Sequence, residues 1–236
     1  MKFSWFLRAA APALLCALAY WQGLAHGPWP AVAAGAMSLL GFAAMAATRD
    51  VAIVCFIGVG AVLLALGFGL VPGFGRLALA GASLNTAKML AGLGAAAMFP
   101  SPLRWNGRST VIALVTLAAV PVVAWAIGHV RWAPASLDAL MAFALANLFT
   151  VIAEEWFFRR WIQQPLQPHV GAVLALLVSA ALFGAAHYAG GQQFMLLAGL
   201  AGLGYAGVFW ATGSIWASVA LHLALNVLRA ALFGLP

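Results

Sequence analysis

The chain has 236 residues, of which 66% are hydrophobic and only 6% are charged, and its formal net charge is +7. Soluble domains carry about 25% charged residues because their surface faces water, so this composition excludes a soluble globular domain and makes lipid the main solvent. The basic residues stand singly or in pairs between apolar stretches, as the loop residues of membrane proteins do. We therefore expect a lipid bilayer around the chain and no nucleic-acid partner.

Apolar runs separated by glycine, proline and charge predict an all-α fold, a polytopic transmembrane helical bundle of eight or nine spans. Each span needs about 20 mainly apolar residues. The first run follows Lys2 and Arg8 and is interpreted as an uncleaved span, not a signal peptide, because further spans follow directly. The expected helices cover residues 5–24, 30–47, 51–71, 77–99, 110–130, 136–164, 170–188, 194–211 and 214–235.

Two of these segments carry an ambiguity. Segment 77–99 contains Asn85 and Lys88, and without it the count falls to eight. We interpret these two side chains as lying at a helix interface or near the membrane surface. Segment 136–164 either runs on to its end or breaks between Trp161 and Pro168, and the prolines there favour the break.

Chemistry-bearing residues gather in the last part of the chain. Residues 1–135 are expected to form N-terminal transmembrane helices without a recognised motif, and residues 136–236 to form a catalytic helical core. An ionisable group within a membrane helix costs about 2.5–3.5 kcal/mol on insertion scales. Such a group is therefore a functional hypothesis by default.

The first group of candidates lies in the stretch Glu154-Glu155-Trp-Phe-Phe-Arg159. Adjacent residues of a helix point about 100° apart, so the two carboxylates occupy different surroundings. Glu155 and Arg159 are four residues apart and are expected to pair. Glu154 has no such partner on its own helix, and a desolvated carboxylate of this kind suits a general base. A structural ion-pair network is the alternative interpretation.

Two further candidates lie on later helices. His187 follows Phe183 by four residues, and Asn226 follows His222 by four residues, so each pair shares a helix face. Polar groups in a stripe on an apolar helix face the protein interior. A hydrogen-bond ladder between helices is the alternative for the second pair. Taken together, the candidates supply a base, a second imidazole and two hydrogen-bond donors, a set that can activate water and hold an oxyanion.

The three ordered motifs, Glu-Glu-x-x-x-Arg, Phe-x-x-x-His and His-x-x-x-Asn, resemble those of the CAAX-protease and bacteriocin-processing (CPBP) family of intramembrane glutamic endopeptidases. The resemblance covers residues 138–229. It implies that Glu154 is the general base on the attacking water and that His187 holds the same water. It further implies that His222 and Asn226 stabilise the oxyanion, while Glu155 and Arg159 brace the site. The length of the chain is similar to that of the myxosortase-like branch, which removes C-terminal sorting signals.

The resemblance implies a substrate that is a membrane-anchored protein or peptide, and a multi-pass protein of the bacterial inner membrane. The oligomeric state is left open. A proton- or ion-coupled transporter and a non-catalytic immunity protein of the same family are the alternatives, although no internal repeat of the kind common in transporters is present. We favour a mechanism without a cofactor. Glu154, His187 and His222 would form a His₂Glu set if Zn²⁺ were bound.

Overall fold

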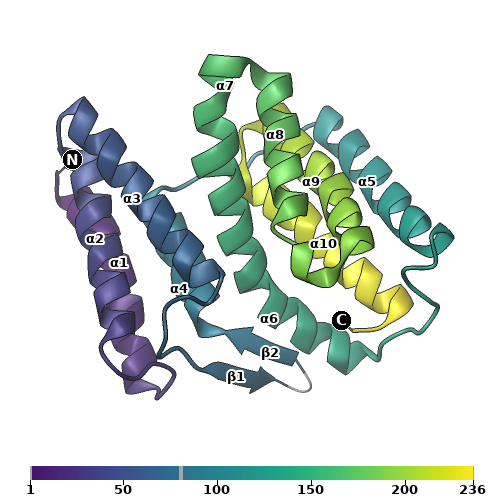
Figure 1. Ribbon diagram of the computed structural model, residues 1–236, viewed down its shortest axis with the longest axis horizontal. Helices are drawn as coiled ribbons and strands as arrows, with labels where there is room; N and C mark the ends of the chain where they lie inside the picture. Colours follow the sequence, from purple (N-terminus) through teal and green to yellow (C-terminus); the bar gives the residue numbers. More distant parts are fainter. Residues whose placement is uncertain (1, 80–81, 236) are drawn as a thin grey trace. The chain divides into compact units, whose positions relative to one another are not determined.

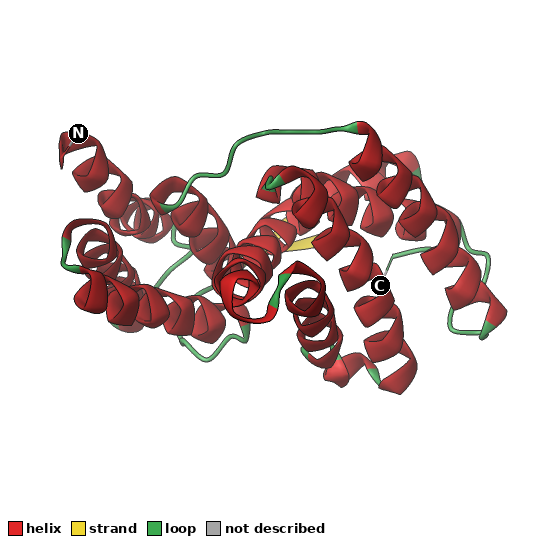
Figure 2. Ribbon diagram, turned by 90° about the horizontal axis from the view of Figure 1, so that it is seen from above, coloured by secondary structure: helices red, strands yellow, loops and turns green. Residues whose placement is uncertain are grey.

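The computed structural model of the protein describes residues 2–79 and 82–235, and almost all of these residues are helical (Figure 2). The chain divides into two compact units. The first unit comprises Met1–Pro100 and Phe149–Phe157, and the second comprises Ser101–Leu148 and Phe158–Pro236. Helix α6 (Leu137–Glu155) contributes residues to both units. Each unit is described by itself below.

The first unit is a bundle of four helices with a short hairpin (Figure 1). Helix α2 packs against α1 and α3, and α4 packs against α1 and α3. Its core is made of fully buried apolar side chains, among them Met37, Val59 and Leu66. The elements are α1 (Lys2–Trp21), α2 (Trp29–Ala46), α3 (Arg49–Gly67), β1 (Arg76–Leu79), β2 (Ala82–Asn85) and α4 (Thr86–Met98).

The hairpin corrects the predicted helix 77–99. Strands β1 and β2 pair antiparallel, with Arg76 opposite Asn85, and the helix begins only at Thr86. The reason is local: the side chain of Asn85 accepts a hydrogen bond from the backbone N–H of Lys88 and so caps the new helix. Asparagine is a preferred N-cap residue because it satisfies a free N–H of the first turn. Residues 80 and 81 of the predicted segment lie outside the described residues.

The second unit is built around α9 (Gln192–Thr212), which packs against α8, α5 and α10. Small residues along α9, such as Ala201, Gly202 and Ala206, are buried and let its neighbours approach closely, as is common for helices in membranes. The other helices of this unit are α5 (Gly107–Ala126), the first part of α6, α7 (Gln164–Val170), α8 (Ala172–Ala185) and α10 (Ile215–Phe233).

The predicted break between Trp161 and Pro168 is wrong. The chain continues from α6 through a π-helix, Trp156–Gln163, directly into α7. Pro165 and Pro168 both lie within α7, and the helix tolerates them close to its end at Val170. The direction of the chain changes only at Gly171, whose φ of +81° is readily adopted by glycine. The change in helix type comes directly after the two motif glutamates and includes Arg159, and such π-helical segments are frequent at functional sites.

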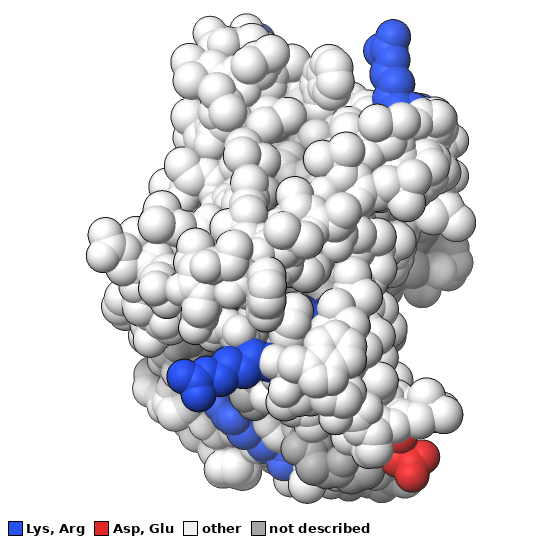
Figure 3. Space-filling view, turned by 90° about the vertical axis from the view of Figure 1, so that its right-hand side faces the viewer, with Lys and Arg blue, Asp and Glu red and all other residues white. Residues whose placement is uncertain are grey.

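Six of the described helices are long and apolar enough to cross a membrane, which confirms the predicted all-α polytopic bundle. Three predicted spans fall outside these six. Helix α1 has 20 residues but carries Arg8, while α4 and α8 have 13 and 14 residues. At 1.5 Å per residue both are about 20 Å long, against the roughly 30 Å of a hydrocarbon core. The face of the protein in Figure 3 is almost wholly uncharged, as expected for an integral membrane protein.

Candidate active site

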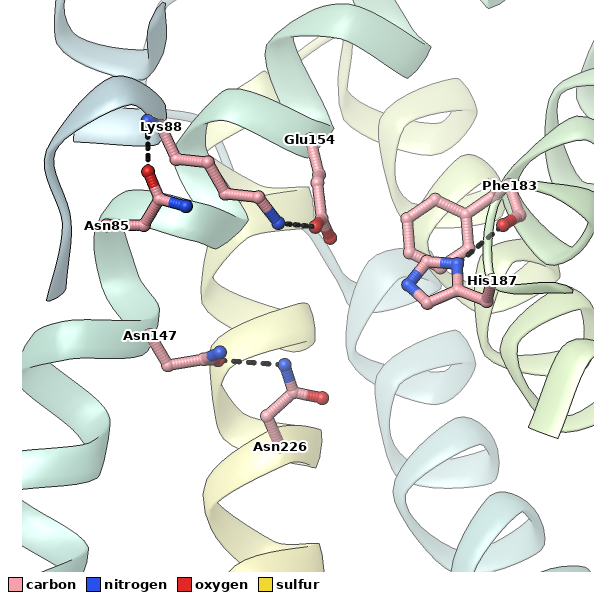
Figure 4. A network of polar contacts seen from close by, with 7 residues as sticks. All are labelled: Asn85, Lys88, Asn147, Glu154, Phe183, His187 and Asn226. Carbon is pink, nitrogen blue, oxygen red and sulfur yellow. Dashed lines mark hydrogen bonds and ion pairs between the residues drawn. The ribbon is translucent and has the colours of Figure 1, made fainter. Parts of the chain in front are cut away.

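Glu154, the predicted general base, lies near the end of α6 within the first unit. Its carboxylate forms an ion pair with Lys88 of α4, with 3.2 Å between Nζ and Oε1 (Figure 4). The side chains of Lys88 and Glu154 are 24% and 20% exposed, so both charges are largely removed from solvent. The ion pair joins α4 to the end of α6, so Lys88 lies at a helix interface, as the sequence analysis expected. The sequence did not predict its partner, although an ionisable residue within an apolar segment is itself a signal.

The packing of α4 against the end of α6 explains why these two side chains meet. A Cβ on Gly92 would lie 2.8 Å from the backbone nitrogen of Ala153 and 3.1 Å from the carbonyl oxygen of Phe149. Glycine is thus required for this backbone approach. Gly92 follows Lys88 by one helical turn and lies on the same face. The indole N–H of Trp156 also donates to the carbonyl oxygen of Phe99, at 3.0 Å.

Glu155 and Arg159, the predicted supporting pair, are both fully buried. The guanidinium of Arg159 donates to the side-chain oxygen of Gln163 at 3.0 Å and to the hydroxyl of Ser179 at 2.9 Å. Gln163 donates in turn to the carbonyl oxygen of Ala206, at 3.0 Å. Arg159 therefore ties the π-helix to α8 directly and to α9 through Gln163. Its expected pairing with Glu155 stays a prediction.

His187 and His222, both in the second unit, each contact the ring of Phe183. The ring centroids lie 4.7 Å from Phe183 to His187 and 5.5 Å from Phe183 to His222. His187 is half-buried and His222 is only 4% exposed. The three residues come from α8, the turn that follows it and α10. Phe183 thus links the two later motifs physically.

The hydrogen bond of His187 defines which ring nitrogen can act. Its Nδ1 lies 2.7 Å from the carbonyl oxygen of Phe183 (Figure 4). A carbonyl oxygen only accepts, so Nδ1 carries the hydrogen and donates. In the neutral ring Nε2 then has the lone pair and accepts a hydrogen bond, for instance from a water molecule.

His222 is held by a second aromatic ring. It stacks on Tyr205 of α9, with 4.3 Å between ring centroids and 15° between the planes. The hydroxyl of Ser218 donates to the carbonyl oxygen of Tyr205 at 2.7 Å, and this bond joins α10 to α9 one turn before His222. Ser218 shares the helix face of His222 by its spacing, four residues earlier on α10. Tyr205 belongs to no predicted motif, and only the packing of α9 against α10 brings it to the site.

Asn226 lies one turn after His222 and is half-buried. Its side-chain N–H donates to the side-chain oxygen of Asn147 on α6, at 2.8 Å (Figure 4). This contact holds the amide of Asn226 in one orientation and leaves the second N–H of the same nitrogen for another acceptor. Asn147 is a polar residue on the helix that also carries Glu154, seven residues before it.

His187, His222 and Asn226 belong to the second unit, whereas Glu154 belongs to the first. Among residues 2–79 and 82–235, no group of three His, Cys, Asp or Glu side chains is gathered closely enough to hold a metal ion. The alternative zinc set of Glu154, His187 and His222 draws on both units and also stays a prediction. The preference for a mechanism without a metal stays a prediction.

The comparison with protein families agrees with the family that the motifs resemble. Residues 134–228 match the family described as Type II CAAX prenyl endopeptidase Rce1-like. No curated protein and no solved structure matches the chain. The matched segment contains all seven motif residues, from Glu154 to Asn226. It confirms that this part of the chain resembles the CAAX-protease-like endopeptidases, as expected of a CPBP family protein.

Proposed function

We propose that this protein is an intramembrane endopeptidase that hydrolyses a peptide bond with a water molecule activated by Glu154. The family match indicates endopeptidase activity within the membrane, and the helices long enough to span a bilayer agree with that setting. The observation that carries the catalytic assignment is the arrangement in the second unit, where two motif histidines contact one phenylalanine ring.

The roles of Glu154 and His187 follow from the charge and the hydrogen bonds of each side chain. Glu154 is a carboxylate with a counter-charge, so it can take a proton from water. His187 offers the lone pair of Nε2, because Nδ1 is used by a carbonyl group, and it orients the same water. The motif order and the family match support these two roles.

Charge develops on the carbonyl oxygen of the substrate when water attacks. His222 and Asn226 would donate hydrogen bonds to this oxyanion. Both are held in place before the reaction, His222 by stacking on Tyr205 and Asn226 by its bond to Asn147. Donors fixed in advance stabilise an oxyanion strongly, and removing one such donor typically costs about 10²–10³-fold in kcat.

The proposed substrate class follows from the membrane setting of the protein. A protease in the bilayer acts on membrane-associated substrates, so we propose a membrane-anchored protein or a protein with a C-terminal membrane signal. We place the enzyme in the bacterial inner membrane. Removal of C-terminal sorting signals, as in the myxosortase-like branch, is the form of this activity that we favour.

The test is a comparison of C-terminal peptides from membrane proteins in cells that carry the wild type or Glu154→Gln. His222→Ala serves as a second catalytic variant. Asp138→Asn is the matched control, since it removes an exposed carboxylate from the first turn of the same helix. Membrane levels of every variant are matched by immunoblot.

We expect Glu154→Gln and His222→Ala to accumulate the same uncut precursors, while Asp138→Asn processes them as the wild type does. The accumulated precursors would name the substrates. If all variants process membrane proteins equally at matched levels, the protease assignment fails and a transporter or an immunity protein becomes the better reading. If a chelator abolishes cleavage and only added Zn²⁺ restores it, a zinc mechanism replaces the metal-free one.

A further inference from the structure

We infer that Lys88 is a positioning residue of the active site, which holds the carboxylate of Glu154 in place through their ion pair. The inference rests on the proposed function, because it assigns Lys88 to the glutamate that would activate water. Lys88 lies in the N-terminal part of the chain, outside the segment that matches the family. Through Lys88, the N-terminal part of the chain would contribute to the placement of the catalytic glutamate.

The first argument is the position of Lys88 in its own helix. It is the third residue of α4, in the first turn. A helix N-terminus carries a partial positive charge and disfavours a cation. A lysine there is locally unfavourable, and the carboxylate of Glu154 at 3.2 Å offsets this cost.

The second argument is that both ends of the lysine are held. Its backbone N–H donates to the side chain of Asn85, at 3.1 Å, and its ammonium group meets Glu154 (Figure 4). Asn85 caps the helix at the residue where the chain leaves the hairpin. The capped first turn of α4 therefore fixes the backbone position from which the Lys88 side chain extends to Glu154.

The third argument is the close approach of the helix backbones. Gly92, one turn after Lys88, allows α4 to contact Ala153, the residue directly before Glu154. The register of the two helices is thus set by main-chain contact next to the ion pair. Such contact leaves little freedom for the distance between Lys88 and Glu154.

These facts matter for catalysis because a general base must be ionised and correctly placed. Removing a carboxylate from water disfavours its charged form unless an opposite charge is close. Among residues 2–79 and 82–235, the pair of Lys88 and Glu154 is the one lysine–carboxylate bridge that the structure records. An ammonium group bound through Oε1 compensates the charge and restricts the rotation of the carboxylate.

The experiment uses the purified full chain in liposomes and a precursor that accumulates with Glu154→Gln. Lys88→Met and Lys88→Gln remove the charge, Lys88→Arg keeps it, and Arg76→Met is the matched control. Arg76 is an exposed cation of strand β1, in the same unit. Cleavage rates are measured over a range of precursor concentrations so that kcat and KM are separated.

We expect kcat to fall about 10- to 100-fold in both neutral variants, as for other losses of orientation at an active site, with KM changed less than about twofold. Lys88→Arg should recover most of the rate, and Arg76→Met should match the wild type. Thermal unfolding in detergent provides the second readout. Lys88→Met should lower the midpoint in the wild-type background and lower it clearly less in Glu154→Gln, where the charge to be compensated is gone.

The outcomes separate the two proposals. If no precursor accumulates in cells with Glu154→Gln, the proposed function fails, and the role of Lys88 fails with it. If Glu154→Gln is inactive but the neutral Lys88 variants cleave at the wild-type rate, only the role of Lys88 is overturned. A loss of stability in Lys88→Met that is the same in both backgrounds would also overturn it, since the pair would then not be coupled.

Discussion

The close approach at Gly92 gives a sharp prediction, because one methyl group should disturb the ion pair without touching either charge. In Gly92→Ala the new Cβ would lie 2.8 Å from the nitrogen of Ala153, against an ordinary contact of 3.4 Å or more. The neighbouring atoms are mostly backbone and cannot rotate away. Helix α4 must therefore move by about 0.6 Å relative to the end of α6.

The size of the effect follows from this shift. Overpacking of a tight contact costs about 1–3 kcal/mol, while alanine gains about 0.5–1 kcal/mol over glycine within a helix. We expect a net loss of about 0.5–2 kcal/mol of stability. If the shift lengthens the contact between Lys88 and Glu154 from 3.2 Å, the bond weakens. Small misplacements of this kind cost up to about 100-fold in rate, and we expect cleavage to slow by about tenfold.

The assay combines thermal unfolding in detergent with the cleavage of an identified precursor in liposomes. Gly35→Ala is the control, because a Cβ there meets no atom within 4 Å, and it lies in helix α2 of the same unit. We expect the control to keep full activity and to gain stability. A Gly92→Ala protein that is as stable and as active as the control would refute the reasoning that backbone contact at Gly92 positions the pair.

Three further substitutions test single contacts. Asn147→Ala should slow cleavage about tenfold in the wild type and have no further effect in Asn226→Ala, because it acts through the orientation of that amide; a kinetic double-mutant cycle measures this. Trp156→Phe should cost about 1–3 kcal/mol in thermal unfolding, since it leaves the carbonyl of Phe99 without its indole donor. Gln163→Leu should lower the unfolding midpoint more than Gln164→Leu, because Gln163 is fully buried between Arg159 and α9 whereas Gln164 is exposed.

The order of helices and the membrane setting could be predicted from the sequence because both depend on local composition. A chain with 6% charged residues has to use lipid as its solvent, and a run of about 20 apolar residues has few folds available there other than a helix. The motif residues could be found for the same reason, since a polar group on an apolar helix is conspicuous. The spacing of Phe183 and His187 placed them on one helix face, and the resemblance to the CPBP family suggested a role for His187.

Local chemistry within single segments was harder to predict. Asn85 reads as one polar residue in an apolar run, but as an N-cap it ends a hairpin and starts α4. Pro165 reads as a helix breaker, but close to the end of α7 it is tolerated. In both cases the outcome depends on the exact position of the residue relative to a helix end, and composition does not specify this position.

Contacts between distant segments were decided by the tertiary structure alone. Lys88 and Glu154 are 66 residues apart, and they meet because Gly92 lets two backbones approach. Tyr205 stacks on His222 because α9 packs against α10. Spacing along one helix shows which side chains share a face, but it carries no information about the helix that covers this face. The sequence alone therefore determined the candidate residues, and packing decided which neighbours hold them.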